Sequence, residues 1–294
     1  MTQPKLLVSL HEGYGLGDAA QMSAVLRHVA KYRPEWSVDY RAEEGKHQVG
    51  RGIVANTSSL REPTPSAHYD AEVQIVLYDK WYGWYDRPNT VAARCLHECF
   101  GLSWDPECGQ QRIEISYRAR RMARTLLVHD RVVAVHYEGT SAQHKKNLTH
   151  EQADRICHYI ERIGYTPVIL DWQYRCLLTH HRRLRAPAAW GTDAEMVCAV
   201  IGQCRAFVGI DSGPAKCASA TDTPSLVVWT GHHPAQFHDP APNTTHLVPV
   251  GYHSIEPVRG DPDVVEWFER NYNYRFYVAD PVGTVKKWLK ERLG

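Results

Sequence analysis

The chain has 294 residues, enough for two domains of ordinary size. Its 34 Lys and Arg residues balance 33 Asp and Glu residues, and a formal net charge of +1 gives no global field that would draw it to nucleic acid. It has no run of about 18 apolar residues and no signal peptide, so we expect a soluble cytoplasmic protein without a membrane span. The 8 cysteines include no Cys-x-x-Cys pair, which predicts reduced thiols rather than disulfides or zinc ligands.

The first half of the chain alternates short apolar runs with amphipathic segments. It predicts strands at 6–10, 37–40, 53–54 and 73–77, and helices at 19–31 and 90–100. A glycine-rich loop, 11–18, joins the first strand to the first helix. The spacing of Gly13, Gly15 and Gly17 differs from the G-x-G-x-x-G dinucleotide fingerprint, which argues against a nicotinamide enzyme.

The pattern weakens near Arg118. The stretch 117–131 holds five arginines and a few apolar residues, which predicts a solvated helix leading into a linker. A basic patch for an acceptor phosphate is the alternative interpretation.

A second strand and helix alternation begins at 132. It predicts strands at 132–136, 167–170, 206–209 and 225–229, a helix after the capping box of Thr149 and Gln152, a helix at 193–204, and a final packing helix at 282–293. Such alternation is typical of parallel sheets covered on both faces, with ligands at the carboxyl ends of the strands. We expect domains at 1–128 and 129–278, with residues 279–294 as a packing helix.

The most informative segment is 208–220, a buried strand that ends in an Asp211-Ser212-Gly213 turn opening a helix of small residues. Such a turn directs backbone N–H groups and the helix dipole at its ligand, and both favour an anion such as phosphate. Gly213 lets the backbone approach closely, whereas Pro214 removes one N–H donor.

Three motifs together resemble the heptosyltransferase-like glycosyltransferases of family 9. These are Gly17-Asp18 opening a helix, residues 136–139 followed by Lys145-Lys146, and the Asp-Ser-Gly turn followed by Thr223-Pro224. The resemblance covers nearly the whole chain and implies an α/β protein of GT-B architecture, with two Rossmann-like domains facing across a cleft. The chain differs from the family pattern at Lys216, where a histidine is usual, and at Asn147, where an aromatic residue is usual.

The resemblance also implies the activity. The enzyme would move a sugar from a nucleoside-diphosphate donor, ADP-heptose by default, to an acceptor hydroxyl with inversion. The acceptor would be a glycan, a lipid-linked molecule or a small molecule, and no cofactor or metal would be needed beyond the nucleotide sugar. The residues implied for the donor and its phosphates are Lys145 or Lys146, Asp211, Ser212, Gly213 and Lys216, with weaker candidates at His136, Glu138, Glu195 and His232.

Asp18 is the candidate base that takes the acceptor proton, because it follows the glycine-rich turn at the end of the first strand. The alternative is an N-cap for a helix starting at Ala19. Gly15, Gly17, Trp81 and Trp84 are placed on the acceptor side, although the aromatic cluster 81–85 could equally cover the core.

His232, His233, His238 and Asp239 have poor spacing for tetrahedral zinc, so no metal is expected there. Three other functions are consistent with the same residues: an epimerase or hydrolase acting on the nucleotide sugar alone, a non-catalytic sugar-nucleotide-binding module, and a glycosyltransferase acting on nucleic acid. Only the arginines of 118–124 and the segment 180–185 favour the last of these.

Overall fold

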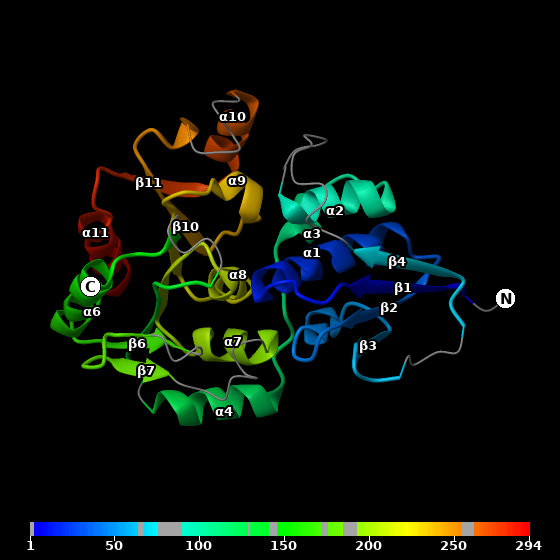
Figure 1. Cartoon of the computed structure of the whole chain (residues 1–294), viewed down its shortest axis with the longest axis horizontal. Helices are drawn as coiled ribbons and strands as arrows, with labels where there is room; N and C mark the ends of the chain where they lie inside the picture. The colour runs from blue at the N-terminus through cyan, green and yellow to red at the C-terminus, as the bar shows by residue number, and fades with distance from the viewer. Residues whose placement is uncertain are drawn as a thin grey trace.

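The structure is a computed structural model that describes residues 3–63, 68–75, 90–128, 130–140, 146–171, 176–184, 193–254 and 262–294. In these ranges the strands form two parallel sheets, one of 4 strands in the order β3-β2-β1-β4 and one of 7 strands in the order β11-β10-β9-β8-β5-β6-β7. Helices cover the sheets, and the two halves meet where α1 lies against α8 (Figure 1). The predicted α/β architecture of two parallel sheets is confirmed.

The first sheet is built on β1 at its centre. Its strands are β1 (Lys5–Leu10), β2 (Ser37–Ala42), β3 (Asn56–Ser59) and β4 (Ala71–Ile75). The accompanying helices are α1 (Leu16–Tyr32), η1 (His47–Gly50), α2 (Val91–Phe100), α3 (Pro106–Gly109) and α4 (Tyr117–Leu127).

The second sheet is larger. Its strands are β5 (Val132–His136), β6 (Thr166–Leu170), β7 (Arg182–Leu184), β8 (Ala206–Ile210), β9 (Ser225–Val228), β10 (Thr244–Pro249) and β11 (Asn273–Tyr277). Its helices are α6 (His150–Arg162), α7 (Ala194–Ile201), α8 (Gly213–Ser219), α9 (Pro234–Phe237), η4 (Tyr252–Ser254), α10 (Pro262–Asn271) and α11 (Val282–Leu293).

The two faces of the second sheet are packed differently. Side chains alternate along a strand, so Val132 and Ala134 of β5 join one apolar cluster while Val133 and Val135 join another. The first cluster includes α7 and α8 and continues into α1 and the first sheet. The second includes the buried faces of α6 and α11. The first sheet and one face of the second therefore share a continuous apolar core.

Several boundaries differ from the sequence predictions. The first helix begins at Leu16 and not at Ala19, because Gly15 adopts the extended N-cap conformation. The strand expected at 53–54 is a turn, and β3 follows it at Asn56–Ser59. Strands β7, β10 and β11 were not predicted, and residues 76–77 of the fourth strand lie outside the described ranges.

The domain limits at 128 and 278 stay a proposal. The helix expected at 117–131 is present as α4, and its arginines 118, 120, 121 and 124 are exposed as the solvated-helix interpretation predicts. α4 packs on α7 of the second half, and α11 packs on α6.

No helix in the described ranges combines the length and the apolar character needed to cross a membrane.

Candidate active site

The β8–α8 junction carries the most deeply buried charges of the site. β8 is buried throughout and ends at Ile210, and Asp211 and Ser212 follow before α8 begins at Gly213. Asp211 is 3% exposed and Lys216, on α8, is 7% exposed. Because α8 has 7 residues and Pro214 lacks an N–H, side-chain cations carry most of the positive charge at this junction.

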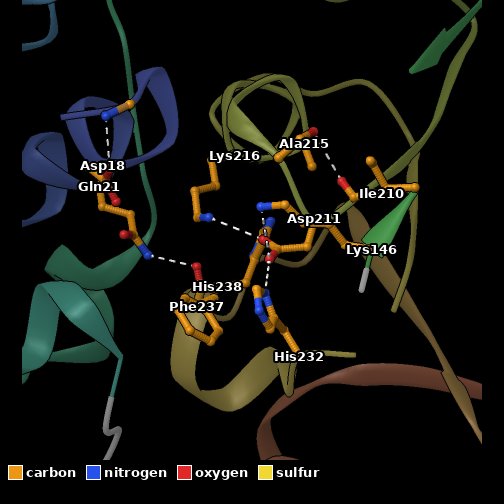
Figure 2. Close-up of polar contacts among 12 residues, drawn as sticks. Asp18, Gln21, Lys146, Ile210, Asp211, Ala215, Lys216, His232, Phe237 and His238 are labelled. Atoms are coloured by element: carbon orange, nitrogen blue, oxygen red, sulfur yellow. Dashed lines mark hydrogen bonds and ion pairs between the residues drawn. The ribbon is translucent and has the colours of Figure 1, made fainter. Parts of the chain in front are cut away.

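Three cationic or potentially cationic groups surround the Asp211 carboxylate (Figure 2). Lys216 Nζ lies 3.3 Å from Oδ1, while His232 Nδ1 and Lys146 Nζ lie 2.8 Å and 3.9 Å from Oδ2. Burial alone would raise the pKa of Asp211, but Lys216, His232 and Lys146 outweigh it and hold this pKa well below the usual range. Asp211 is therefore an ionised carboxylate that fixes the positions of two lysines.

Two hydrogen bonds join the residues that follow Lys146 to the residues that follow β5. The Gly139 N–H donates to Asn147 Oδ1 at 2.9 Å, and the Leu148 N–H donates to the Tyr137 carbonyl at 3.1 Å. Burial lowers the pKa of Lys146 against the opposing effect of Asp211. Asn147, which departs from the family pattern, thus binds the backbone of Gly139 beside the lysine.

His136 and Ser212 connect the ends of two neighbouring strands. His136 ends β5, which pairs with β8, and its Nδ1 lies 3.1 Å from Ser212 Oγ. The Ser212 hydroxyl donates to the Ile210 carbonyl at 3.1 Å, which leaves His136 Nδ1–H as the donor to Ser212. Burial lowers the pKa of His136 to about 4, so the ring is neutral at pH 7.

Asp18 lies at the third position of α1 and is half-buried. Its Oδ2 accepts a hydrogen bond from the Gly15 N–H at 3.0 Å, so the prediction that Asp18 is the N-cap of a helix starting at Ala19 is wrong. Burial raises the pKa of Asp18, and the nearby charge of Lys216 only partly opposes this effect. The structure thus gives this carboxylate a helix-start hydrogen bond and a raised proton affinity together.

Two glycines let the two junctions touch. A Cβ added at Gly17 would lie 2.9 Å from Lys216 Cδ, and a Cβ added at Gly213 would lie 2.9 Å from Leu16 Cβ and 3.1 Å from the Gly17 nitrogen. Figure 2 shows the Lys216 side chain projecting between Asp18 and Asp211. The close approach therefore brings the candidate base and the cationic group together.

A second contact between the halves lies one turn further along α1. Gln21 Nε2 donates to the Phe237 carbonyl at 2.9 Å (Figure 2). Gln21 is fully buried, so this hydrogen bond fixes α1 against the C-terminal end of α9.

Glu195 is not part of this cluster. It lies in the first turn of α7, where its carboxylate binds Arg51 Nη1 at 2.8 Å and the Ser116 N–H at 2.7 Å. These contacts join segments of the two halves and give no support to a donor role. A cleft of about 280 Å³ lined by Arg51, Glu114, Ser116 and neighbours likewise shares no residue with the cluster around Asp211.

The remaining predicted residues divide into two groups. Glu138 is half-buried shortly after the end of β5, and Gly15 is exposed at the start of α1. Lys145, Trp81 and Trp84 lie outside the described residues, so their predicted roles stay predictions.

The histidines after β9 have contacts of their own. His233 Nδ1 accepts from the Ala235 N–H at 3.1 Å, and His238 lies 3.0 Å from both Ser219 Oγ and the Asp239 carbonyl. Burial lowers the pKa of His233 to about 3 and that of His238 to about 4, so both are neutral. Sequence reasoning missed a different histidine cluster, on α6 and before β7, because its members lie in separate segments.

Comparisons with known proteins bear on the fold. No family model matches the sequence, and no curated protein matches it at a significant level. A glycosyl transferase family 9 structure from Veillonella parvula aligns with a TM-score of 0.62 at 14% identity, covering 92% of this chain and 97% of its own.

Two E. coli structures are also similar. The ADP-heptose lipopolysaccharide heptosyltransferase II aligns with a TM-score of 0.62 at 13% identity, covering 90% of this chain and 99% of its own. The iron-containing dodecameric glycosyltransferase TibC aligns with a TM-score of 0.59 at 15% identity, covering 83% of this chain and 65% of its own. The chain therefore has the GT-B fold of solved family 9 glycosyltransferase structures.

Proposed function

We propose that this protein is a glycosyltransferase that uses a nucleoside-diphosphate sugar. The observation that carries the proposal is the pairing of one buried carboxylate, Asp211, with two buried lysines beside a carboxylate of raised pKa, Asp18. Asp211 accepts ion pairs from both lysines, and their two buried ammonium groups would bind the negative oxygens of a diphosphate. The fold shared with family 9 glycosyltransferases agrees with this assignment.

The leaving diphosphate would bind to Lys146 and Lys216, with the Ser212 segment beside it. Negative charge grows on the leaving oxygen as the glycosidic bond breaks, so ammonium groups already held in place stabilise the transition state more than the ground state. Asp211 would act as a positioning residue, since it holds Lys216 at 3.3 Å and Lys146 at 3.9 Å. This arrangement supplies the charge that a metal ion supplies in other transferases, and we propose a metal-independent reaction.

Asp18 would remove the proton of the acceptor hydroxyl as that oxygen attacks the anomeric carbon. A raised pKa makes a carboxylate a stronger base, and the Gly15 N–H fixes its orientation. Attack from the side opposite the diphosphate gives inversion without a covalent enzyme intermediate. We propose ADP-heptose as the first donor to test, because the similar E. coli structure is an ADP-heptose heptosyltransferase. The acceptor would be a glycan, a lipid-linked molecule or a small molecule.

The decisive experiment compares Asp18→Asn with wild type for transfer rate and for ADP affinity. Asparagine keeps the size of the side chain and an oxygen for the Gly15 N–H, but it cannot accept a proton. We expect the transfer rate to fall about a hundredfold or more while ADP affinity changes less than about threefold. Asp193→Asn is the matched control, because Asp193 is also a carboxylate of raised pKa that accepts a helix-start N–H, from Met196 at 2.9 Å.

The outcomes separate the alternative functions. An unchanged rate in Asp18→Asn would show that Asp18 is only a helix-start residue. ADP binding without transfer or hydrolysis of any sugar nucleotide would favour a binding module. Release of free sugar with no acceptor requirement would favour a hydrolase.

A further inference from the structure

One cluster of titratable side chains lies outside the candidate active site. Asp154, His158 and Glu161 follow one another on a single face of α6, at spacings of four and three residues. His180 and His181 form the turn immediately before β7. The crossover from α6 through β6 brings these segments together although they are about twenty residues apart in sequence.

The three histidines converge on one carboxylate. Asp154 Oδ1 lies 2.6 Å from His180 Nε2 and 2.9 Å from His181 Nε2, and Asp154 Oδ2 lies 3.5 Å from His158 Nε2. One ligand atom from each of the four residues lies within 4.8 Å of all the others. Tetrahedral Zn²⁺ with bonds of about 2.0–2.1 Å separates its ligand atoms by about 3.3 Å, so small side-chain rotations suffice to form a site.

Glu161 orients two of these rings from behind. Its Oε1 lies 3.1 Å from His181 Nδ1 and its Oε2 lies 3.2 Å from His158 Nδ1. When Nδ1 donates to a carboxylate, Nε2 keeps its lone pair, which is the tautomer that binds a metal. The His181 side chain is 1% exposed, whereas those of His158 and His180 are 59% and 54% exposed, which leaves a path for an ion to enter.

The position of the cluster excludes a role in sugar transfer. His180 and His181 precede the first residue of β7, and the end of α6 leads into the start of β6. The cluster therefore lies at the amino edge of the parallel sheet, whereas His136 is the last residue of β5 and Asp211 follows the last residue of β8.

We propose that Asp154, His158, His180 and His181 bind one divalent transition metal of the Zn²⁺ class through three imidazoles and a carboxylate, with Glu161 as a positioning residue. The ion would join α6 to the edge strand β7 and stabilise this side of the second sheet. Three imidazoles and one carboxylate suit Zn²⁺ and Co²⁺ better than Mg²⁺ or Ca²⁺, which prefer oxygen ligands.

The test uses the full chain, stripped with EDTA and dialysed. Co²⁺ should produce visible d–d absorption of tetrahedral intensity, Zn²⁺ should remove it by competition, and Zn²⁺ should raise the melting temperature. His158→Asn combined with His180→Asn should abolish all three effects, and these two positions are exposed enough for the variant to fold. His150→Asn, on the same helix but outside the cluster, is the matched control and should behave as wild type.

Glu161→Gln distinguishes a positioning role from a ligand role. It should weaken Co²⁺ affinity about 10–100-fold while leaving the absorption bands in place, because the four ligands remain. Absence of Co²⁺ bands and of any Zn²⁺-dependent melting shift in wild type would overturn the proposal and leave the cluster as an ion-pair network. An equal response in the double variant and in wild type would also overturn it.

Discussion

The β1–α1 and β8–α8 junctions each place an aspartate within two residues of a glycine at the start of a helix, yet the two carboxylates lie in opposite electrostatic surroundings. Asp211 has two lysines and His232 around it and a depressed pKa. Asp18 accepts one hydrogen bond from a backbone N–H, and burial raises its pKa although the charge of Lys216 partly opposes this. The same local architecture thus gives Asp211 an ion-paired carboxylate with a lowered pKa and Asp18 a carboxylate with a raised pKa.

The strongest test of this contrast is Asp211→Asn. Removing the negative charge leaves Lys216 and Lys146 buried without their partner, and breaking a buried ion pair in this way costs about 3–5 kcal/mol of unfolding free energy. Chemical denaturation at pH 7 measures this loss. Glu291→Gln, which removes an exposed partner of Arg275, is the control and should cause a far smaller change. A stable Asp211→Asn variant would show that the two lysines are hydrated.

A smaller effect is expected from Lys216→Met. Methionine keeps a similar volume against Gly17 but removes the ammonium group, so ADP affinity should fall about 10–100-fold, as expected when a charged hydrogen bond is lost. Isothermal titration calorimetry with ADP measures the change. Lys290→Met, on the exposed face of α11, is the control. Equal ADP affinity in both variants would separate Lys216 from phosphate binding.

The smallest expected effect is on the unfolding free energy of Asp18→Asn, which we expect to rise, whereas that of Asp211→Asn should fall. A group whose folded pKa is raised contributes stability below its unfolded pKa and loses it as the pH rises through the folded pKa. Above that pH the buried carboxylate is destabilising, so Asp18→Asn should raise the unfolding free energy by roughly 1 kcal/mol at pH 8.

The pH dependence gives the control for the Asp18 stability prediction. The advantage of Asp18→Asn should shrink as the pH falls through the raised pKa of Asp18, because the wild-type carboxylate then becomes protonated. Asp211 has a depressed pKa and therefore contributes stability above its unfolded pKa, so the deficit of Asp211→Asn should be fully present over the same pH range. Parallel pH profiles for the two variants would contradict the contrast between the junctions.

The sequence predicted well those elements in which apolar periodicity is strong. β8 and its turn were located because 206–210 is a continuous apolar run that ends in Asp-Ser-Gly. β10 and β11 were missed because they carry Thr244, His246, Asn273 and Arg275, which read as loop residues. His246 is fully buried, and its Nδ1 accepts a hydrogen bond from Trp229 Nε1 at 3.0 Å, a contact that no local pattern reveals.

The site was predicted less completely than the fold. The sequence could place Asp211 and Lys216 in one site because they are five residues apart, in the turn before α8 and on α8 itself. The contact between His232 and Asp211 depends on the path of the chain after β9, which the sequence does not show. The donor role expected for Glu195 stays a prediction, and only the folded structure shows that its carboxylate binds Arg51. The histidine cluster was missed because His158 lies on α6, whereas His180 and His181 lie in a separate segment before β7.

The contact between Gly17 and Gly213 has an evolutionary consequence. These positions are far apart in sequence, yet a side chain at Gly17 would press on Lys216, and a side chain at Gly213 would press on Leu16 and the Gly17 backbone. The two positions are therefore coupled: a larger residue at either one displaces Lys216 or the facing helix start, and with it the spacing between Asp18 and Lys216. The pair therefore constrains how far relatives of this chain can diverge around the junction before the two halves lose their alignment.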